Sequence, residues 1–184
     1  MTTTARIPGF QGEYLWELEI ATRRLLAMAE ALPADKYAWR PDPDARTVSA
    51  VLVHVAAGNF MLLEAVGLPV PRDLYGDVTG EGQDRLWALV RKNDELEAAM
   101  RDKSAVVDML KRSLEAVNQS FSQSSNDELE RRLHFFGEET SVRRVFLRLL
   151  SHAHEHMGQM IAYFRFNNLA PPWPNWRPDR RSQD

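Results

Sequence analysis

Apolar residues recur along most of the chain at intervals of three and four positions, a spacing that places them on one face of an α-helix. Four long stretches show this spacing most clearly, at residues 11–31, 48–66, 104–122 and 141–167. A weaker helical pattern covers residues 83–100. The pattern therefore predicts a mainly helical protein with four long helices and one further short helix.

Proline, glycine and a strand-like segment separate the predicted helices. Residues 32–47 contain three prolines, which exclude a regular helix because proline lacks the backbone N–H. Residues 67–82 are punctuated by glycine and proline and are expected to form the longest irregular connection. Residues 131–140, RRLHFFGEET, look extended with a turn at Gly137. Because helices with one apolar face bury it by packing together, we expect an all-α fold, a four-helix bundle of the up-and-down type with long loops.

The chain has 184 residues, which is enough to bury one hydrophobic core without disulfides. We expect a flexible N-terminus at residues 1–9, one bundle domain at 10–170, and a tail rich in proline and arginine at 171–184. No internal repeat of fixed period is visible.

Composition narrows the classes of function. The net charge is −3, whereas a protein that binds nucleic acid normally has a clear basic excess, so we expect no nucleic-acid partner. The N-terminus lacks the apolar segment of a secretory signal, and no run of 18 apolar residues occurs, so we expect a cytoplasmic protein that does not contact a membrane. The chain has no cysteine, so a softer metal ion would have to bind to imidazole or carboxylate groups.

The segment HAHEHMGQ, residues 152–159, contains three of the five histidines. On a helix, His152 and His156 lie one turn apart on the same face, whereas His154 points to the other side. Such a pair is consistent with a metal site, and also with a polar border beside an apolar face.

His54 changes the balance between these two interpretations. It lies in the middle of the apolar face of the second predicted helix, so its ring should be buried. A lone buried histidine is usually a core residue with one hydrogen bond. A buried ring that meets a second pair of rings is better explained as a metal site, because burial keeps the imidazoles neutral and able to bind a metal. We therefore predict that His54, His152 and His156 form a metal site.

Two other histidine patterns carry less weight. His152, Glu155 and His156 match the H-x-x-E-H pattern of inverted zinc proteases, but that architecture needs a further carboxylate well downstream, where only 28 residues remain. His134, in the extended segment, has no evident partner and is expected to be a surface or loop histidine.

The sequence resembles the DinB-like superfamily, also called DinB/YfiT-like metalloenzymes. The resemblance is carried by LVHVAAGN in the second helix and by FFGEETSVRRVFLRLLSHAHEHMGQMIAYFRFNNLAPP at the end of the chain. The closing H-x-x-x-H-x-G-Q pattern corresponds to His152, His156, Gly158 and Gln159.

The resemblance implies a four-helix bundle, often a homodimer, with a divalent metal, commonly nickel or zinc, on three histidines. Carried over to this chain, these are again His54, His152 and His156. Relatives of this kind use the site for chemistry with low-molecular-weight thiols such as bacillithiol or mycothiol, or for hydrolysis and isomerisation. The residue before the glycine is usually basic in the family and here is Met157. If that basic residue binds an anionic group, this chain lacks the contact.

Three imidazoles on a divalent metal leave a coordination position open for water or a thiol. Gln159 and Tyr163 follow His156 on its face of the helix and are candidate catalytic residues, with outer-shell hydrogen bonding as the alternative. Further polar or aromatic candidates near the predicted site are Tyr37, Trp39, Asn59, Glu64 and Arg148.

We therefore expect a metal-dependent enzyme, a thiol-dependent S-transferase or a hydrolase that acts on a small molecule. The alternative is a non-catalytic bundle that binds a metal or ligand and acts through its dimer surface. A third possibility is a metal-free bundle, which requires the three rings to be too far apart to share an ion.

Overall fold

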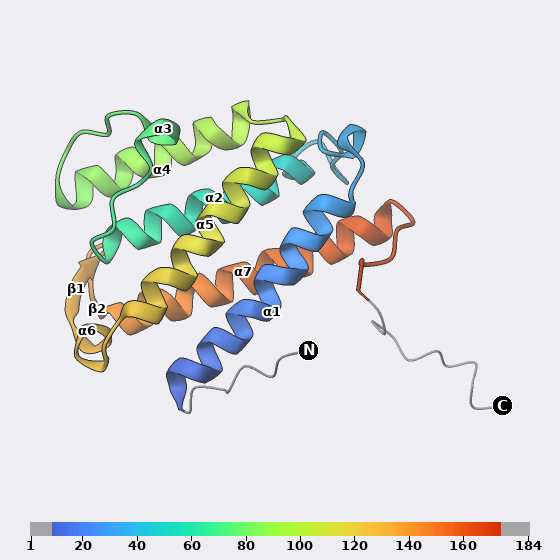
Figure 1. The fold of residues 1–184 in the computed structure, drawn as a ribbon. Helices are drawn as coiled ribbons and strands as arrows, with labels where there is room; N and C mark the ends of the chain where they lie inside the picture. The colour runs from blue at the N-terminus through green and yellow to red at the C-terminus, as the bar shows by residue number, and fades with distance from the viewer. Residues whose placement is uncertain (1–8, 174–184) are drawn as a thin grey trace.

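The computed structural model describes residues 9–173 (Figure 1). The predicted flexible N-terminus and the predicted tail therefore lie almost entirely outside the described residues. Their boundaries, and the domain limits of 10–170, stay predictions.

The four long helices are present, and each end lies within one residue of its predicted position. They are α1 (Phe10–Ala31), α2 (Val48–Ala65), α5 (Lys103–Gln123) and α7 (Val142–Phe166). Side-chain caps fix three of their starts, because Thr47, Asp102 and Ser141 each accept a hydrogen bond from a backbone N–H of the first turn. The weaker pattern corresponds to α4 (Gly82–Ala99).

Shorter elements connect the long helices. Three of them were not predicted, since one helical turn has too few residues to show a periodicity: η1 (Ala34–Lys36), α3 (Arg72–Tyr75) and α6 (Asn126–Glu130). The segment predicted to be extended forms an antiparallel hairpin of β1 (Arg132–Phe135) and β2 (Glu138–Ser141), joined by Phe136 and Gly137.

The helices form the predicted all-α four-helix bundle with long connections. Helix α2 packs against α4, α5 and α7, while α1 packs against α5 and α7. Between α2 and α5, helix α4 carries the chain back along the bundle, so that α2 and α5 run in the same direction (Figure 1). The hairpin lies at the end of the bundle where α7 begins (Figure 1).

Helix α2 lies at the centre of the core. By length and composition it could cross a membrane, but 78% of its span is buried inside the protein, as expected of a helix surrounded by α4, α5 and α7. Its burial explains the sequence pattern, because a helix covered on most sides is apolar on most sides. His54 and Asn59 are the polar residues in the middle of this mostly apolar helix, while Ser49 and Glu64 lie near its ends.

Candidate metal centre

The three predicted ligands come together between α2 and α7. The ring centroids of His54, His152 and His156 lie 4.6 to 5.0 Å apart, and one ring nitrogen from each lies within 4.8 Å of the other two. His154 does not join them. Its Nδ1 donates to the Leu150 carbonyl at 3.0 Å, and its Nε2 lies 3.7 Å from the Glu17 carboxylate of α1.

A glycine lets the two helices bring these rings together. Gly58, one turn after His54, lies directly beneath the His152 ring. A Cβ atom added at Gly58 would lie 2.7 Å from Cε1 of His152, closer than real Cβ contacts allow. The space that His152 occupies therefore depends on the missing side chain of Gly58.

His152 is the most deeply buried of the three, with 6% of its surface exposed. The His54 ring, predicted to be buried, is only partly buried, with 27% of its side chain exposed, because it borders an open pocket. Burial, together with the neighbouring His156 and His54 rings, lowers the pKa of the His152 ring to about 3. Burial also lowers the pKa of His156, although its hydrogen bond with Gln159 opposes the shift. Both rings are therefore neutral at pH 7, which is the form that binds a metal.

The neutral His152 ring also has an unused polar atom. Its Nδ1 is buried and has no hydrogen-bond partner among the residues that the structure describes. Leaving such an atom without a partner costs about 1–3 kcal/mol. A ligand bound at the centre of the three rings would remove part of that cost, so the orphaned atom fits a metal site better than it fits a packed core.

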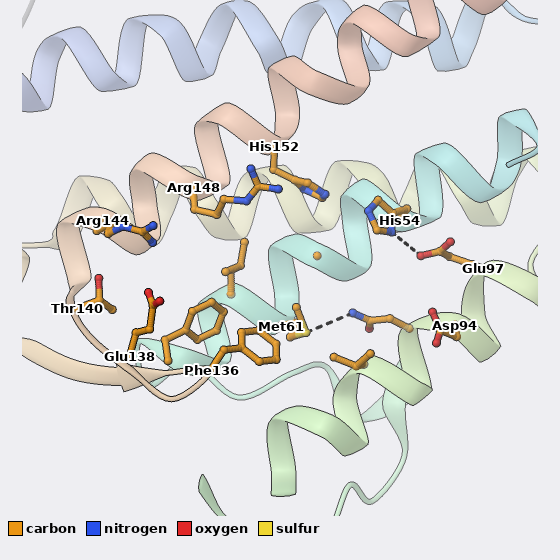
Figure 2. A pocket seen from close by; sticks show the side chains of 15 residues that line it. His54, Met61, Asp94, Glu97, Phe136, Glu138, Thr140, Arg144, Arg148 and His152 are labelled. Atoms are coloured by element: carbon orange, nitrogen blue, oxygen red, sulfur yellow. Dashed lines mark hydrogen bonds and ion pairs between the residues drawn. The ribbon is translucent and has the colours of Figure 1, made fainter. Parts of the chain in front are cut away.

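A carboxylate from α4 orients His54. Glu97 accepts a hydrogen bond from His54 Nδ1 at 2.5 Å (Figure 2). It accepts another from Arg46 Nε at 2.7 Å. Burial raises the pKa of Glu97, but these two hydrogen bonds outweigh it and hold the pKa below its usual value. Because the ionised carboxylate only accepts hydrogen bonds, His54 Nδ1 carries the proton and Nε2 is free to bind a metal.

A second chain of hydrogen bonds orients His156. The Arg46 carbonyl only accepts, so Tyr163 donates its hydroxyl proton to it at 2.9 Å. The Tyr163 oxygen then accepts from Gln159 Nε2 at 3.0 Å, which turns Gln159 Oε1 toward His156 Nδ1 at 2.8 Å. His156 therefore carries its proton on Nδ1 and presents Nε2 to the centre of the site.

Gln159 and Tyr163, the predicted candidates for catalysis, thus act on the site through His156. Neither lines the pocket described below. We assign them positioning roles, and direct participation of either residue in catalysis stays a prediction.

Sequence reasoning missed Arg46 and Glu97. Helix α4 buries Leu86, Leu89, Asn93 and Glu97, so Glu97 continues the buried stripe of this helix. The signal in the sequence was therefore a carboxylate, Glu97, at a position that the helical spacing places on the buried face of α4. It could not be assigned to His54 because the chain alone does not show which face of α2 meets α4.

The other candidates have structural roles. Asn59 donates to Ser113 Oγ at 3.1 Å, and Glu64 binds the Arg85 guanidinium and the Val70 backbone N–H. Tyr37 is buried and donates to the Ala29 carbonyl, and Trp39 packs edge-on against Tyr163 with ring centroids 5.3 Å apart. His134 is exposed on β1 opposite Glu139, as expected for a surface histidine, and Glu155 is exposed and paired with Arg148.

A pocket of about 580 Å³ opens beside the three histidines. Helices α2, α4 and α7 and the hairpin surround it, with His54 and His152 at its inner end (Figure 2). The described residues thus combine two neutral imidazoles, a third imidazole oriented by a carboxylate, and an accessible cavity. This donor set fits a divalent transition metal such as zinc or nickel.

Replacing Glu97 by glutamine should weaken metal binding roughly 10- to 100-fold, the usual cost of losing a partner that orients a metal-binding histidine. The glutamine amide has no charge, and it cannot accept hydrogen bonds from both His54 and Arg46 as the two carboxylate oxygens do. Titration calorimetry with zinc measures the effect. The control is Glu95→Gln on the same helix, because Glu95 is exposed and, within the described residues, pairs only with Lys92. Equal affinities for both variants would contradict the role of Glu97.

Comparison with known proteins identifies the family. Residues 17–160 match the model of the DinB superfamily, which covers most of the chain. The protein therefore belongs to the DinB superfamily. No curated protein matches the sequence significantly.

Solved structures share the fold at low sequence identity. A DinB-like protein from Bacillus cereus is 18% identical with a TM-score of 0.66, and the match covers 89% of this chain and 96% of that chain. YfiT from Bacillus subtilis, described as "a probable metal-dependent hydrolase with an unusual four-helix bundle topology", is 11% identical with a TM-score of 0.61, over 92% of this chain and 95% of that chain. A mycothiol-dependent maleylpyruvate isomerase is 13% identical with a TM-score of 0.60, over 87% of this chain and 63% of that chain. At these identities the similarity establishes the fold alone.

Proposed function

We propose that this protein is a metal-dependent enzyme that acts on a small molecule through a metal bound by His54, His152 and His156. One observation carries the proposal. Two of the three rings, His54 and His152, line the inner end of an open pocket, so a metal there would face a molecule bound in the pocket. A closed structural site has no such access.

We further propose a thiol-dependent S-transferase or a hydrolase. Zinc or nickel, when bound, would supply a Lewis acid that lowers the pKa of water or of a thiol, the two nucleophiles these reactions need. The chain itself would hold the His54 and His156 rings through Glu97 and Gln159, and would limit water around the reacting atoms with apolar pocket walls. Two structures with this fold support the proposal, since one is described as a probable metal-dependent hydrolase and another is an isomerase that depends on the thiol mycothiol.

The proposal is tested with protein purified without a histidine tag and loaded with zinc or nickel. Activated esters are supplied alone, and electrophiles are supplied with a low-molecular-weight thiol. We expect turnover that depends on the metal and is lost in His152→Ala. If one metal binds per chain and no turnover occurs, the alternative holds: a non-catalytic bundle that binds a metal or ligand and acts through its dimer surface.

The proposed setting is a cytoplasmic homodimer with small-molecule partners and no nucleic-acid or membrane partner. The net charge of −3 supports the absence of nucleic acid. Analytical ultracentrifugation tests the dimer, and a single species with the mass of one chain would contradict it.

A further inference from the structure

The pocket has a second polar end, away from the histidines. Figure 2 shows Arg144, Thr140 and Glu138 at the side of the pocket opposite His54 and Glu97, with Arg148 between Arg144 and His152. A ligand that fills the pocket would therefore touch the metal centre at one end and the start of α7 at the other.

Two arginines on α7 reach into this end. Arg144, Arg148 and His152 are spaced four residues apart, so they lie along one stripe of the helix that faces the pocket. Arg148 uses Nη1 to bind Glu155 at 2.9 Å. The Arg144 side chain makes no hydrogen bond or ion pair with the described part of the chain. A guanidinium with free donors is a ready partner for a carboxylate.

A buried hydroxyl group lies beside the arginines. Thr140 is 7% exposed and lines the pocket, and its Oγ1 is buried without a hydrogen-bond partner among residues 9–173. Buried polar atoms are nearly always paired, so an unpaired hydroxyl at a pocket wall indicates a missing ligand. Its position next to Arg144 and Arg148 indicates that this ligand is an acceptor, that is, an anionic group.

The middle of the pocket is apolar, and the hairpin turn that forms part of its wall has a strained backbone. Phe136 and Gly137 form the two-residue turn of the hairpin, with φ of 49° and 83°. Asparagine, aspartate or glycine is preferred at the first position of such a turn, and phenylalanine is costly there. The strained backbone places the Phe136 ring in the pocket wall, edge-on to Phe135 at 4.6 Å and to Trp87 of α4 at 5.5 Å. A flat apolar group would pack against this wall.

We infer that the substrate is an organic monocarboxylic acid with an aromatic or other apolar body. Its carboxylate binds Arg144, Arg148 and the Thr140 hydroxyl, and its body packs against Phe135 and Phe136. That the opposite end reacts at the three histidines rests on the proposed function, whereas binding of the carboxylate does not.

Negative charges in the same pocket refine the ligand class. Asp94 and Glu138 line the pocket and are exposed, while Glu97 is already paired with Arg46 and His54. These carboxylates repel a phosphate dianion more strongly than they repel a monoanion. The pocket as a whole therefore favours a ligand with a single carboxylate over a ligand with a phosphate.

The test measures binding of 3-phenylpropanoate and of its uncharged amide by titration calorimetry, using the full chain loaded with zinc. We expect the acid to bind at least tenfold more tightly than the amide. Arg144→Gln and Arg148→Gln should each remove most of this preference, and Thr140→Val should reduce it. The matched control is Arg143→Gln, since Arg143 neighbours Arg144 but pairs with Glu130 outside the pocket.

Each outcome decides the inference. Equal binding of acid and amide, or no binding of either, would overturn it. A preference that survives both arginine substitutions would mean that the acid binds the metal instead, and would overturn it too. Repeating the titration after chelation separates the two proposals, because the preference should persist without metal. If it persists and no metal-dependent turnover is found, the proposed function fails and the carboxylate site stands.

Discussion

Replacing His152 by alanine should abolish stoichiometric binding of zinc or nickel. The His152 ring is buried and neutral, and its centroid lies 5.0 Å from that of His54 and 4.6 Å from that of His156. Its Nδ1 has no hydrogen-bond partner within residues 9–173. Removal of the ring leaves two imidazoles, which come from different helices. Loss of a residue that only orients a metal-binding histidine weakens metal binding by up to roughly 100-fold, so loss of a ligand itself should weaken it more. Elemental analysis of protein purified without added metal should find about one metal per chain before the substitution and none after it.

The thermal midpoint gives a second measure of the same effect. A metal that binds only the folded chain stabilises it, by about 2.7 kcal/mol at a free concentration one hundred times Kd. Added zinc should therefore raise the melting temperature of the parent protein and leave that of His152→Ala unchanged. The control is His154→Ala, because His154 contacts Leu150 and Glu17 on the far side of α7. If His152→Ala and His154→Ala lost metal equally, the conclusion that His154 points away from the metal site would be wrong.

Replacing Gly58 by alanine should also cause a large loss of metal affinity, approaching that of His152→Ala. The new Cβ would lie 2.7 Å from Cε1 of His152, so the ring must leave its position beside His54 and His156. The helix itself is not weakened, because alanine favours helix by about 1 kcal/mol over glycine. Calorimetric titration with zinc measures the affinity, and far-ultraviolet circular dichroism confirms that the helices remain.

The chain provides a matched control in Gly158 of α7. A Cβ added there would meet nothing within 4 Å, although Gly158 lies only two residues from His156. Gly158→Ala should therefore bind metal as the parent does and melt at the same or a higher temperature. If Gly58→Ala retained the affinity of the parent protein, the His152 ring would have room to move without leaving the metal, contrary to the close contact described above.

The positions of the helices and the facing of the histidines could be predicted because both depend on local periodicity. Helix bounds follow from apolar spacing and from caps such as Thr47 and Ser141. The pairing of His152 with His156, and the exclusion of His154, follow from the 100° turn per residue within a single helix. Short elements such as α3 and α6 escaped prediction because one turn carries no periodic signal.

What only the tertiary structure decided is how separate elements meet at the site. The sequence alone predicted the four long helices and the shared face of His152 and His156 from the repeat within single helices. The bundle class followed from the apolar faces of those helices, and His54 was added because it lies on such a face and because the family resemblance implies it. The sequence did not determine that Gly58 leaves room for the His152 ring or that Glu97 binds His54. It also did not show that Arg46 contacts both Glu97 and Tyr163, which orient His54 and His156. Nor did it show that the hairpin forms part of the wall of a pocket beside α7. These contacts depend on how the helices pack in three dimensions, and that packing is set by the fit of many side chains across the whole core.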